Sequence, residues 1–283
     1  MKKYSITLIA IFAFCLQALA QQPTIHAILT IDRDDKSIGC EIDEASIKRM
    51  LDQAGIETAM PVRYYITDRS ISDIRAKISS LSVGKDDAVF YYYSGHGYRY
   101  QNQSSKYPYL ALKDASLREV GVTRDEYSPK DSKVGEKNKN VQIPSRANAL
   151  GLEEISTLIR AKNARVVMTI GDLCNSTIPA PEPQPIAASI LLLNNYERLF
   201  KKSRGYFVVC SSKPGQPSLG SGTIGGLFTN SFLEAYSESV KASTKADWRT
   251  IFSKSFDITR AKTSGRTDPQ TPVVDEINIT YID

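Results

Sequence analysis

Short apolar runs alternate with amphipathic segments along most of this chain. The runs predict strands at 24–31, 62–67, 88–93, 164–170, 205–210 and 272–275. The segments between them repeat apolar residues at helical spacing, which indicates helices at 41–54, 71–81, 150–161, 227–240 and 248–262. Strands that alternate with helices usually form a mostly parallel sheet covered on both faces. We therefore expect an α/β fold, a three-layer αβα sandwich whose sheet has about six strands.

Two irregular stretches interrupt this alternation. Residues 115–148, which follow a possible short hairpin strand at 107–113, have no apolar period and indicate a polar surface insertion. Residues 178–204 are rich in proline at first and end in the basic cluster Lys201, Lys202 and Arg204, which predicts a link. We expect one part of the domain before this link, at 21–177, and another after it, at 205–283.

The amino terminus has the pattern of a secretory leader. Lys2 and Lys3 precede an apolar run over 6–19, and Ala18-Leu19-Ala20 fits a signal-peptidase site. The sequence thus predicts a signal peptide at 1–20, a mature domain at 21–283, and an exported protein of periplasmic or extracellular location. No later apolar run is long enough for a membrane span, so we expect no membrane attachment after cleavage.

Composition excludes one class of partner. The chain has 283 residues, 24% of them charged, with a formal net charge of +5. This excess is mild, and no stretch interleaves basic with aromatic residues, so we expect no nucleic-acid partner. The sequence does not specify an oligomeric state.

Histidine is scarce, which narrows the candidate chemistry. The chain has only His26 and His96. His26 lies within an apolar strand, where a packed side chain is expected. His96 follows a predicted strand between two glycines, in Ser94-Gly-His-Gly97. These glycines permit unusual backbone angles and expose the imidazole.

The cysteines also differ in their surroundings. After the leader, Cys40, Cys174 and Cys210 remain, a sparse and odd set that argues against a disulfide framework. Cys210 ends an apolar run and is expected to be buried. Cys174 follows another strand in polar company, after Asp172, so it and His96 would meet at one sheet edge as a nucleophile and base. The spacing of the cysteines and histidines fits no zinc site. The sequence also lacks the G-x-S-x-G motif that would indicate a serine hydrolase.

These motifs resemble the caspase/metacaspase family of cysteine peptidases. The resemblance rests on the SGHG motif and on Asp172-Leu-Cys-Asn-Ser176, and it extends to 38–45, 209–216 and 226–229. It implies a caspase-fold cysteine endopeptidase with a large-subunit-like part at 21–177 and a small-subunit-like part at 205–283.

The resemblance also implies roles for individual residues. Cys174 would attack the peptide carbonyl, and His96 would protonate the leaving amine. The backbone N–H groups of Gly97 and Cys174 would stabilise the oxyanion. No third member of a triad is evident, and the family commonly uses a dyad.

Metacaspases select Lys or Arg with an acidic S1 pocket. Transferred to this sequence, its members are Cys40, Asp43, Ser94 and Asp172. The implied partners are protein or peptide substrates with a basic P1 residue, since paired carboxylates suit a cation and disfavour an acidic side chain.

Some features depart from the family or stay open. The spacing of 78 positions from His96 to Cys174 exceeds the roughly 50 of caspases, and the polar insertion accounts for the excess. Asn175-Ser176 stands where metacaspases usually have His-Ser-Gly. The dyad requires no cofactor or metal; calcium activation is possible, but the family's calcium-binding acidic residues are not matched here.

Two alternatives and one extension follow from the same residues. The chain is either an active peptidase or an inactive caspase-fold binding and scaffold module. A third interpretation is a clostripain- or gingipain-like peptidase, which would share the dyad and the Arg/Lys preference. Self-cleavage is also predicted, after Lys201, Lys202 or Arg204 or within 115–148.

Overall fold

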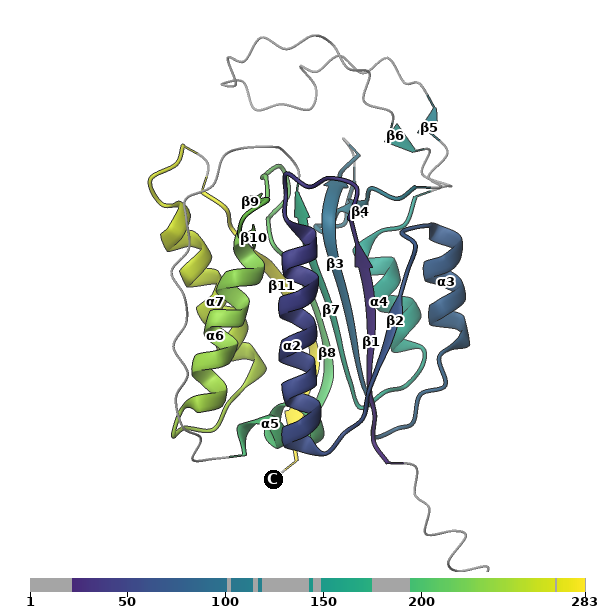
Figure 1. The fold of residues 1–283 in the computed structure, drawn as a ribbon, viewed down its shortest axis with the longest axis vertical. Helices are drawn as coiled ribbons and strands as arrows, with labels where there is room; N and C mark the ends of the chain where they lie inside the picture. Colours follow the sequence, from purple (N-terminus) through teal and green to yellow (C-terminus); the bar gives the residue numbers. More distant parts are fainter. Residues whose placement is uncertain are drawn as a thin grey trace, which may run out of the picture.

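The computed structural model describes residues 22–100, 103–113, 117–118, 143–144, 149–174, 194–267 and 269–282 (Figure 1). The predicted signal peptide lies outside these residues. So do most of the predicted insertion and the proline-rich part of the predicted link.

A mostly parallel sheet forms the centre of the domain. Its strand order is β11-β8-β7-β3-β1-β2, and the short β4 pairs with β3 beyond this path. The β11–β8 and β3–β4 pairs are antiparallel and the others are parallel. The strands are β1 (Ile25–Ile31), β2 (Val62–Ile66), β3 (Ala88–Tyr98), β4 (Tyr109–Leu110), β7 (Val166–Cys174), β8 (Ser203–Cys210) and β11 (Val273–Tyr281). The expected α/β sheet is confirmed.

Helices cover both faces of the sheet and complete three layers. The apolar sides of α2 (Cys40–Thr58), α6 (Leu227–Lys241) and α7 (Trp248–Thr263) pack in one core cluster. Those of α3 (Ile71–Ser80) and α4 (Leu152–Arg160) pack in a second cluster across the sheet. In Figure 1 the sheet lies between α6 and α7 on the left and α3 and α4 on the right.

Three short pairs or turns complete the described fold. The hairpin β9 (Gly220–Ser221) and β10 (Gly225–Gly226) stands apart from the main sheet, and β5 (Leu117–Arg118) pairs with β6 (Ile143–Pro144). Before β8, the chain forms a helical segment, α5 (Asn195–Glu197) and the π-helical η3 (Arg198–Lys202).

The central strand β3 anchors both cores. Phe90 and Tyr92 enter the α2 side, while Tyr91 and Tyr93 enter the other, as the alternation of a strand requires. All four side chains are fully buried. Burial of such a side chain stabilises the fold by about 2–3 kcal/mol, so β3 has a fixed place between its neighbours.

Two strands are longer than their apolar runs. The runs end near Tyr93 and Ile170, but β3 and β7 remain paired through Ser94–Asp172 to His96–Cys174. His96 and Cys174 therefore lie within strands rather than in turns beyond them. The physical reason is that backbone groups make the ladder, and polar side chains at its end do not interrupt it.

The predicted link overlaps ordered elements. Lys201 and Lys202 lie in η3, and Arg204 lies in β8. Leu199 and Phe200 beside them are fully buried, and the Asn195 amide donates to carbonyl oxygens at the end of α6 and beyond it. Cleavage after these basic residues requires this packing to open.

The structure also corrects one helix end. The predicted helix at 41–54 continues past Gly55, which lies inside α2, and Ala59 with φ of 52° ends it. None of the helices in the described part of the chain is both long and apolar enough to cross a membrane.

Candidate active site

The predicted catalytic residues meet at the carboxyl edge of the sheet. His96 on β3 is the register partner of Cys174 on β7. Adjacent strands lie about 4.8 Å apart, so the two backbones are immediate neighbours. The sequence-based expectation that these residues share one edge agrees with this register.

Hydrogen bonds hold His96 on its backbone and its ring. The Tyr93 hydroxyl and the Ala111 N–H both donate to the His96 carbonyl oxygen, at 2.7 and 3.0 Å. The imidazole Nε2 lies 2.8 Å from Oδ2 of Asp35. The His96 side chain is 36% exposed, which is compatible with access by a substrate.

The glycines beside His96 do not provide the unusual backbone angles that the sequence led us to expect. Neither Gly95 nor Gly97 has a positive φ. A Cβ on Gly97 would lie 3.0 Å from Cβ of Leu173, and one on Gly95 would lie 2.9 Å from Cβ of Asp32. Both positions are therefore glycine because other segments of the chain approach closely, not because the backbone is unusual.

Two carboxylates are buried beside these strand ends. The Ser94 hydroxyl donates to Asp43 Oδ2 at 2.7 Å, and the Gly226 N–H donates to Asp43 Oδ1 at 2.8 Å. Asp172 accepts from the Ser218 hydroxyl at 2.7 Å and from the N–H and hydroxyl of Thr229 at 3.0 and 2.7 Å. Every carboxylate oxygen of this acidic pair has a neutral donor.

Burial and proximity make both carboxylates reluctant to ionise. Asp43 is 2% exposed and Asp172 is 5% exposed. Loss of water raises the pKa of Asp43 well above its usual value, and the neighbouring Asp172 raises it further. Loss of water also raises the pKa of Asp172, although hydrogen bonds from Thr229 and Ser218 oppose the effect. A cation between the two would relieve this cost.

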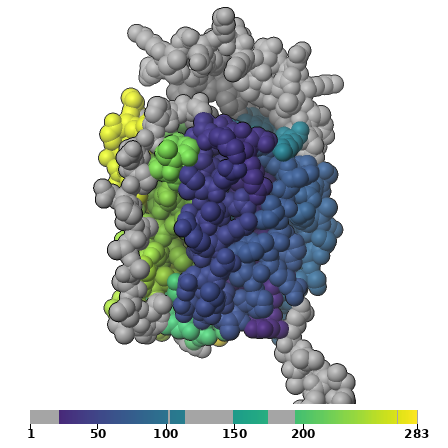
Figure 2. Space-filling model, in the orientation of Figure 1, coloured from purple at the N-terminus to yellow at the C-terminus, as the bar shows by residue number. Residues whose placement is uncertain are grey.

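The β9–β10 hairpin covers the acidic pair. A Cβ on Gly226 would lie 2.0 Å from Asp172 Oδ2, and one on Gly225 would lie 2.1 Å from Asp43 Oδ1. Gly225 also has φ of 78°, which favours glycine. The hairpin abuts the start of α2, since a Cβ on Gly39 would lie 2.2 Å from the Ser221 carbonyl oxygen (Figure 2).

The remaining sequence candidates are also placed. Cys40, the fourth predicted S1 residue, begins α2 and is 2% exposed. Cys210 is fully buried in the core, as expected, and burial raises the pKa of its thiol to about 12. Neither cysteine is in a disulfide. His26 is buried as expected, and it contacts Asp87 Oδ2 at 3.0 Å and the Tyr65 hydroxyl at 3.1 Å.

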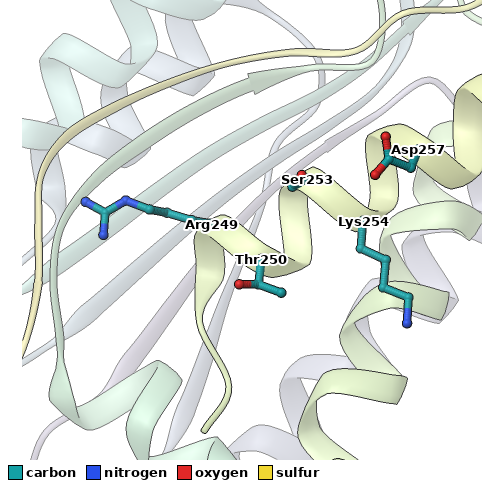
Figure 3. A pocket seen from close by; sticks show the side chains of 5 residues that line it. All are labelled: Arg249, Thr250, Ser253, Lys254 and Asp257. Carbon is teal, nitrogen blue, oxygen red and sulfur yellow. The ribbon is translucent and has the colours of Figure 1, made fainter. Parts of the chain in front are cut away.

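A surface hollow on α7 is separate from these residues. It has a volume of about 410 Å³ and is lined by Arg249, Thr250, Ser253, Lys254 and Asp257 (Figure 3). Its cations are paired, Arg249 with Glu276 and Lys254 with Glu238. It contains neither thiol nor imidazole. Within the described ranges, no cluster of three or more acidic, His or Cys side chains could hold a metal ion.

Sequence reasoning missed three polar contributors to this site. Ser218 and Thr229 hold Asp172, and Asp35 contacts His96. Thr229 falls in a segment that resembles the family, so a signal was present there. No sequence signal pointed to Asp35, because the loop after β1 has three aspartates and only the fold determines which of them contacts His96.

Comparisons with known proteins relate this chain to the caspases. The caspase domain model matches residues 28–273. A crystal structure of caspase-1 from Spodoptera frugiperda is similar, with a TM-score of 0.52 and 11% identity over 90% of this chain and 88% of that chain. None of the curated proteins matches. At this identity the structural likeness shows the fold alone. Because the family model spans most of the sequence, the chain belongs to the caspase domain family of cysteine peptidases.

Proposed function

We propose that this protein is an exported cysteine endopeptidase that cleaves after Lys or Arg. The observation that supports it most is that Asp43, Ser94 and Asp172 converge beside the paired strand ends of His96 and Cys174. Family membership supports peptidase chemistry in general. The acidic pair supports the choice of substrate.

The proposed reaction uses His96 and Cys174 in two stages. The Cys174 thiol gives its proton to His96, and sulfur bonds to the carbonyl carbon of the scissile peptide. The C–N bond then breaks as His96 protonates the leaving amine. Water, deprotonated by His96, hydrolyses the thioester and regenerates the thiol. The N–H groups of Gly97 and Cys174 are the proposed oxyanion donors.

The proposed specificity follows from the electrostatics of the acidic pair. Two carboxylates with only neutral donors favour a guanidinium or ammonium group over a carboxylate. Cys40 would complete the pocket as its neutral wall. For a P1 side chain to enter, the β9–β10 hairpin must move, and the cation would replace the Gly226 N–H at Asp43.

The test is turnover of fluorogenic peptides that differ only at P1. We expect the mature chain to cleave after Arg and Lys and to reject Asp by at least about 100-fold. Assays with calcium and with a chelator address the prediction that the dyad needs no metal. Equal rates for Arg and Asp would exclude an acidic S1 pocket.

Matched variants assign the thiol. We expect Cys174→Ala and His96→Ala to abolish turnover, while Cys210→Ala, which changes a fully buried thiol in the core, retains it. Alkylation should label Cys174 and block turnover. Activity that survives in Cys174→Ala would refute the assignment.

A binding or scaffold module is the second candidate. The closed hairpin over the acidic pair favours it, because such a closed site admits no P1 side chain. No thiol-inhibitable turnover in any of these assays, from a folded protein, would favour this candidate. The clostripain or gingipain alternative is not retained, since the matching family is the caspase domain family.

Export and self-cleavage complete the proposal. N-terminal sequencing of protein recovered outside the inner membrane should begin at Gln21. We expect self-cleavage in the Lys-rich segment 115–148 rather than after Lys201 or Lys202, because η3 is packed. Mass spectrometry of wild type beside Cys174→Ala would locate such cuts.

A further inference from the structure

The Asp35–His96 contact lies outside the dyad but touches its base. Oδ2 of Asp35 lies 2.8 Å from Nε2 of His96, although the two residues are 61 positions apart in the sequence. The two side chains are 33% and 36% exposed. The contact therefore stands at the open edge of the sheet and not in the core.

Asp35 is held independently of His96. Its other oxygen, Oδ1, accepts from the Ser37 N–H at 2.9 Å and from the Ser37 hydroxyl at 2.6 Å. The Ser37 hydroxyl has the largest effect on the pKa of Asp35 and lowers it; burial, the next largest effect, raises it, and the His96 contact lowers it again, so the pKa is lowered overall. The carboxylate is thus ionised at neutral pH, with Oδ2 left for the imidazole.

The loop that bears Asp35 is itself fixed at several points. Arg33 bonds to Glu44 of α2 at 2.6 and 3.0 Å, and Lys36 bonds to Glu41 at 2.5 Å. The hairpin packs against the same loop, since a Cβ on Gly222 would lie 2.5 Å from the Lys36 carbonyl oxygen. A carboxylate on a braced loop can orient a ring that contacts it.

We propose that Asp35 is a positioning residue that fixes the tautomer and orientation of His96. An ionised carboxylate only accepts hydrogen bonds, so Nε2 must carry the proton in their contact. In neutral His96 the lone pair then lies on Nδ1. Nδ1 is therefore the atom that takes the thiol proton and returns it to the leaving amine. The catalytic role of Asp35 in this inference rests on the proposed function. The tautomer of His96 rests only on its contact with Asp35.

The tautomer can be measured directly, because the chain has only two imidazoles. Long-range ¹H–¹⁵N spectra of Cys174→Ala protein, recorded at about pH 9, show whether each ring is neutral and which of its nitrogens carries the proton. We expect His96 to show the Nε2–H tautomer, and a His96→Gln sample assigns its signals. In Asp35→Asn the amide can donate as well as accept, so we expect a mixture of tautomers.

Kinetics of variants supply the second readout. We expect Asp35→Asn to lower kcat by about 10- to 100-fold, with little change in KM, since part of the acid–base contribution is lost. Asp35→Glu should restore part of the rate, and Ser37→Ala should fall between. Asp34→Asn is the matched control, because Asp34 is 62% exposed and contacts Arg69 and Lys113 instead.

The two readouts separate the inference from the proposed function. An unchanged Nε2–H spectrum in Asp35→Asn, or an Nδ1–H tautomer with Asp35 present, overturns the inference whatever the activity. Full kcat in a folded Asp35→Asn enzyme overturns it as well. If wild type cleaves no basic peptide, the proposed function fails, and the spectra still decide whether Asp35 orients His96.

Discussion

Substitution of Asp43 by Asn should stabilise the fold and impair the proposed activity. The side chains are nearly the same size, and both contacts survive the change. The amide oxygen can accept from the Gly226 N–H, and the amide NH₂ can donate to the Ser94 hydroxyl. The substitution therefore removes a charge from beside Asp172 with little change in packing.

The pH dependence of this stabilisation has a defined sign. The folded-state pKa of Asp43 is raised by burial and by Asp172, so ionisation costs more in the folded than in the unfolded protein. The Asp43 carboxyl group contributes its full stabilisation of the folded wild type below its unfolded-state pKa, about 3.9. This stabilisation is lost as the pH rises through its folded-state pKa. The gain from Asp43→Asn should be near zero in acid and grow toward alkaline pH.

The magnitude follows from burial. Asp43 is 2% exposed, so solvent screens the effect little. A buried polar group that lacks a full partner costs about 1–3 kcal/mol, and more when it is charged, so we expect a gain on the order of 1–3 kcal/mol at pH 8. A domain of this size gains about 2–4 °C in Tm per kcal/mol, which gives a rise of roughly 5 °C. Differential scanning calorimetry between acid and pH 8 measures it.

Two comparisons make this prediction refutable. Asp257→Asn removes a carboxylate that is 65% exposed and should leave Tm nearly unchanged at every pH. A small guanidinium ligand should raise the Tm of wild type more than that of Asp43→Asn, because it compensates the acidic pair. If Asp43→Asn lowers Tm equally in acid and at pH 8, Asp43 is an ordinary hydrogen-bond acceptor and the electrostatic reasoning is wrong.

Other predictions concern the hairpin, the buried histidine and the link. Gly226→Ala should lower Tm and reduce cleavage, since its Cβ would lie 2.0 Å from a carboxylate oxygen, whereas Gly265→Ala has nothing within 4 Å and should change neither. His26→Ala should cost about 1–3 kcal/mol in urea unfolding because it removes one buried partner of Asp87, whose remaining donors are the Thr24 and Gly84 N–H groups, and equal stability would contradict this. Intact mass should show no cut within 175–197, which has no Lys or Arg; a cut there would argue against a basic P1 preference.

The pattern of apolar residues was sufficient to predict the helices and strands, because burial of one face of each element requires that pattern. The predicted strand at 88–93 lies within β3, and the predicted helix at 248–262 matches α7 within one residue. The scarcity of histidine leaves His96 as the candidate base, because the other imidazole, His26, lies inside an apolar run. Strand ends were less accurate, since β3 and β7 continue by backbone pairing that side-chain polarity does not reveal.

The sequence by itself determined the α/β class and the residues with chemical potential, because periodicity and composition are local properties of the chain. Only the tertiary structure decided which aspartate meets His96, that Asp43 and Asp172 share one buried site, and that a glycine hairpin closes it. These contacts join residues 51 to 183 positions apart. No local pattern encodes such distances; the register of the sheet and the packing of its loops set them.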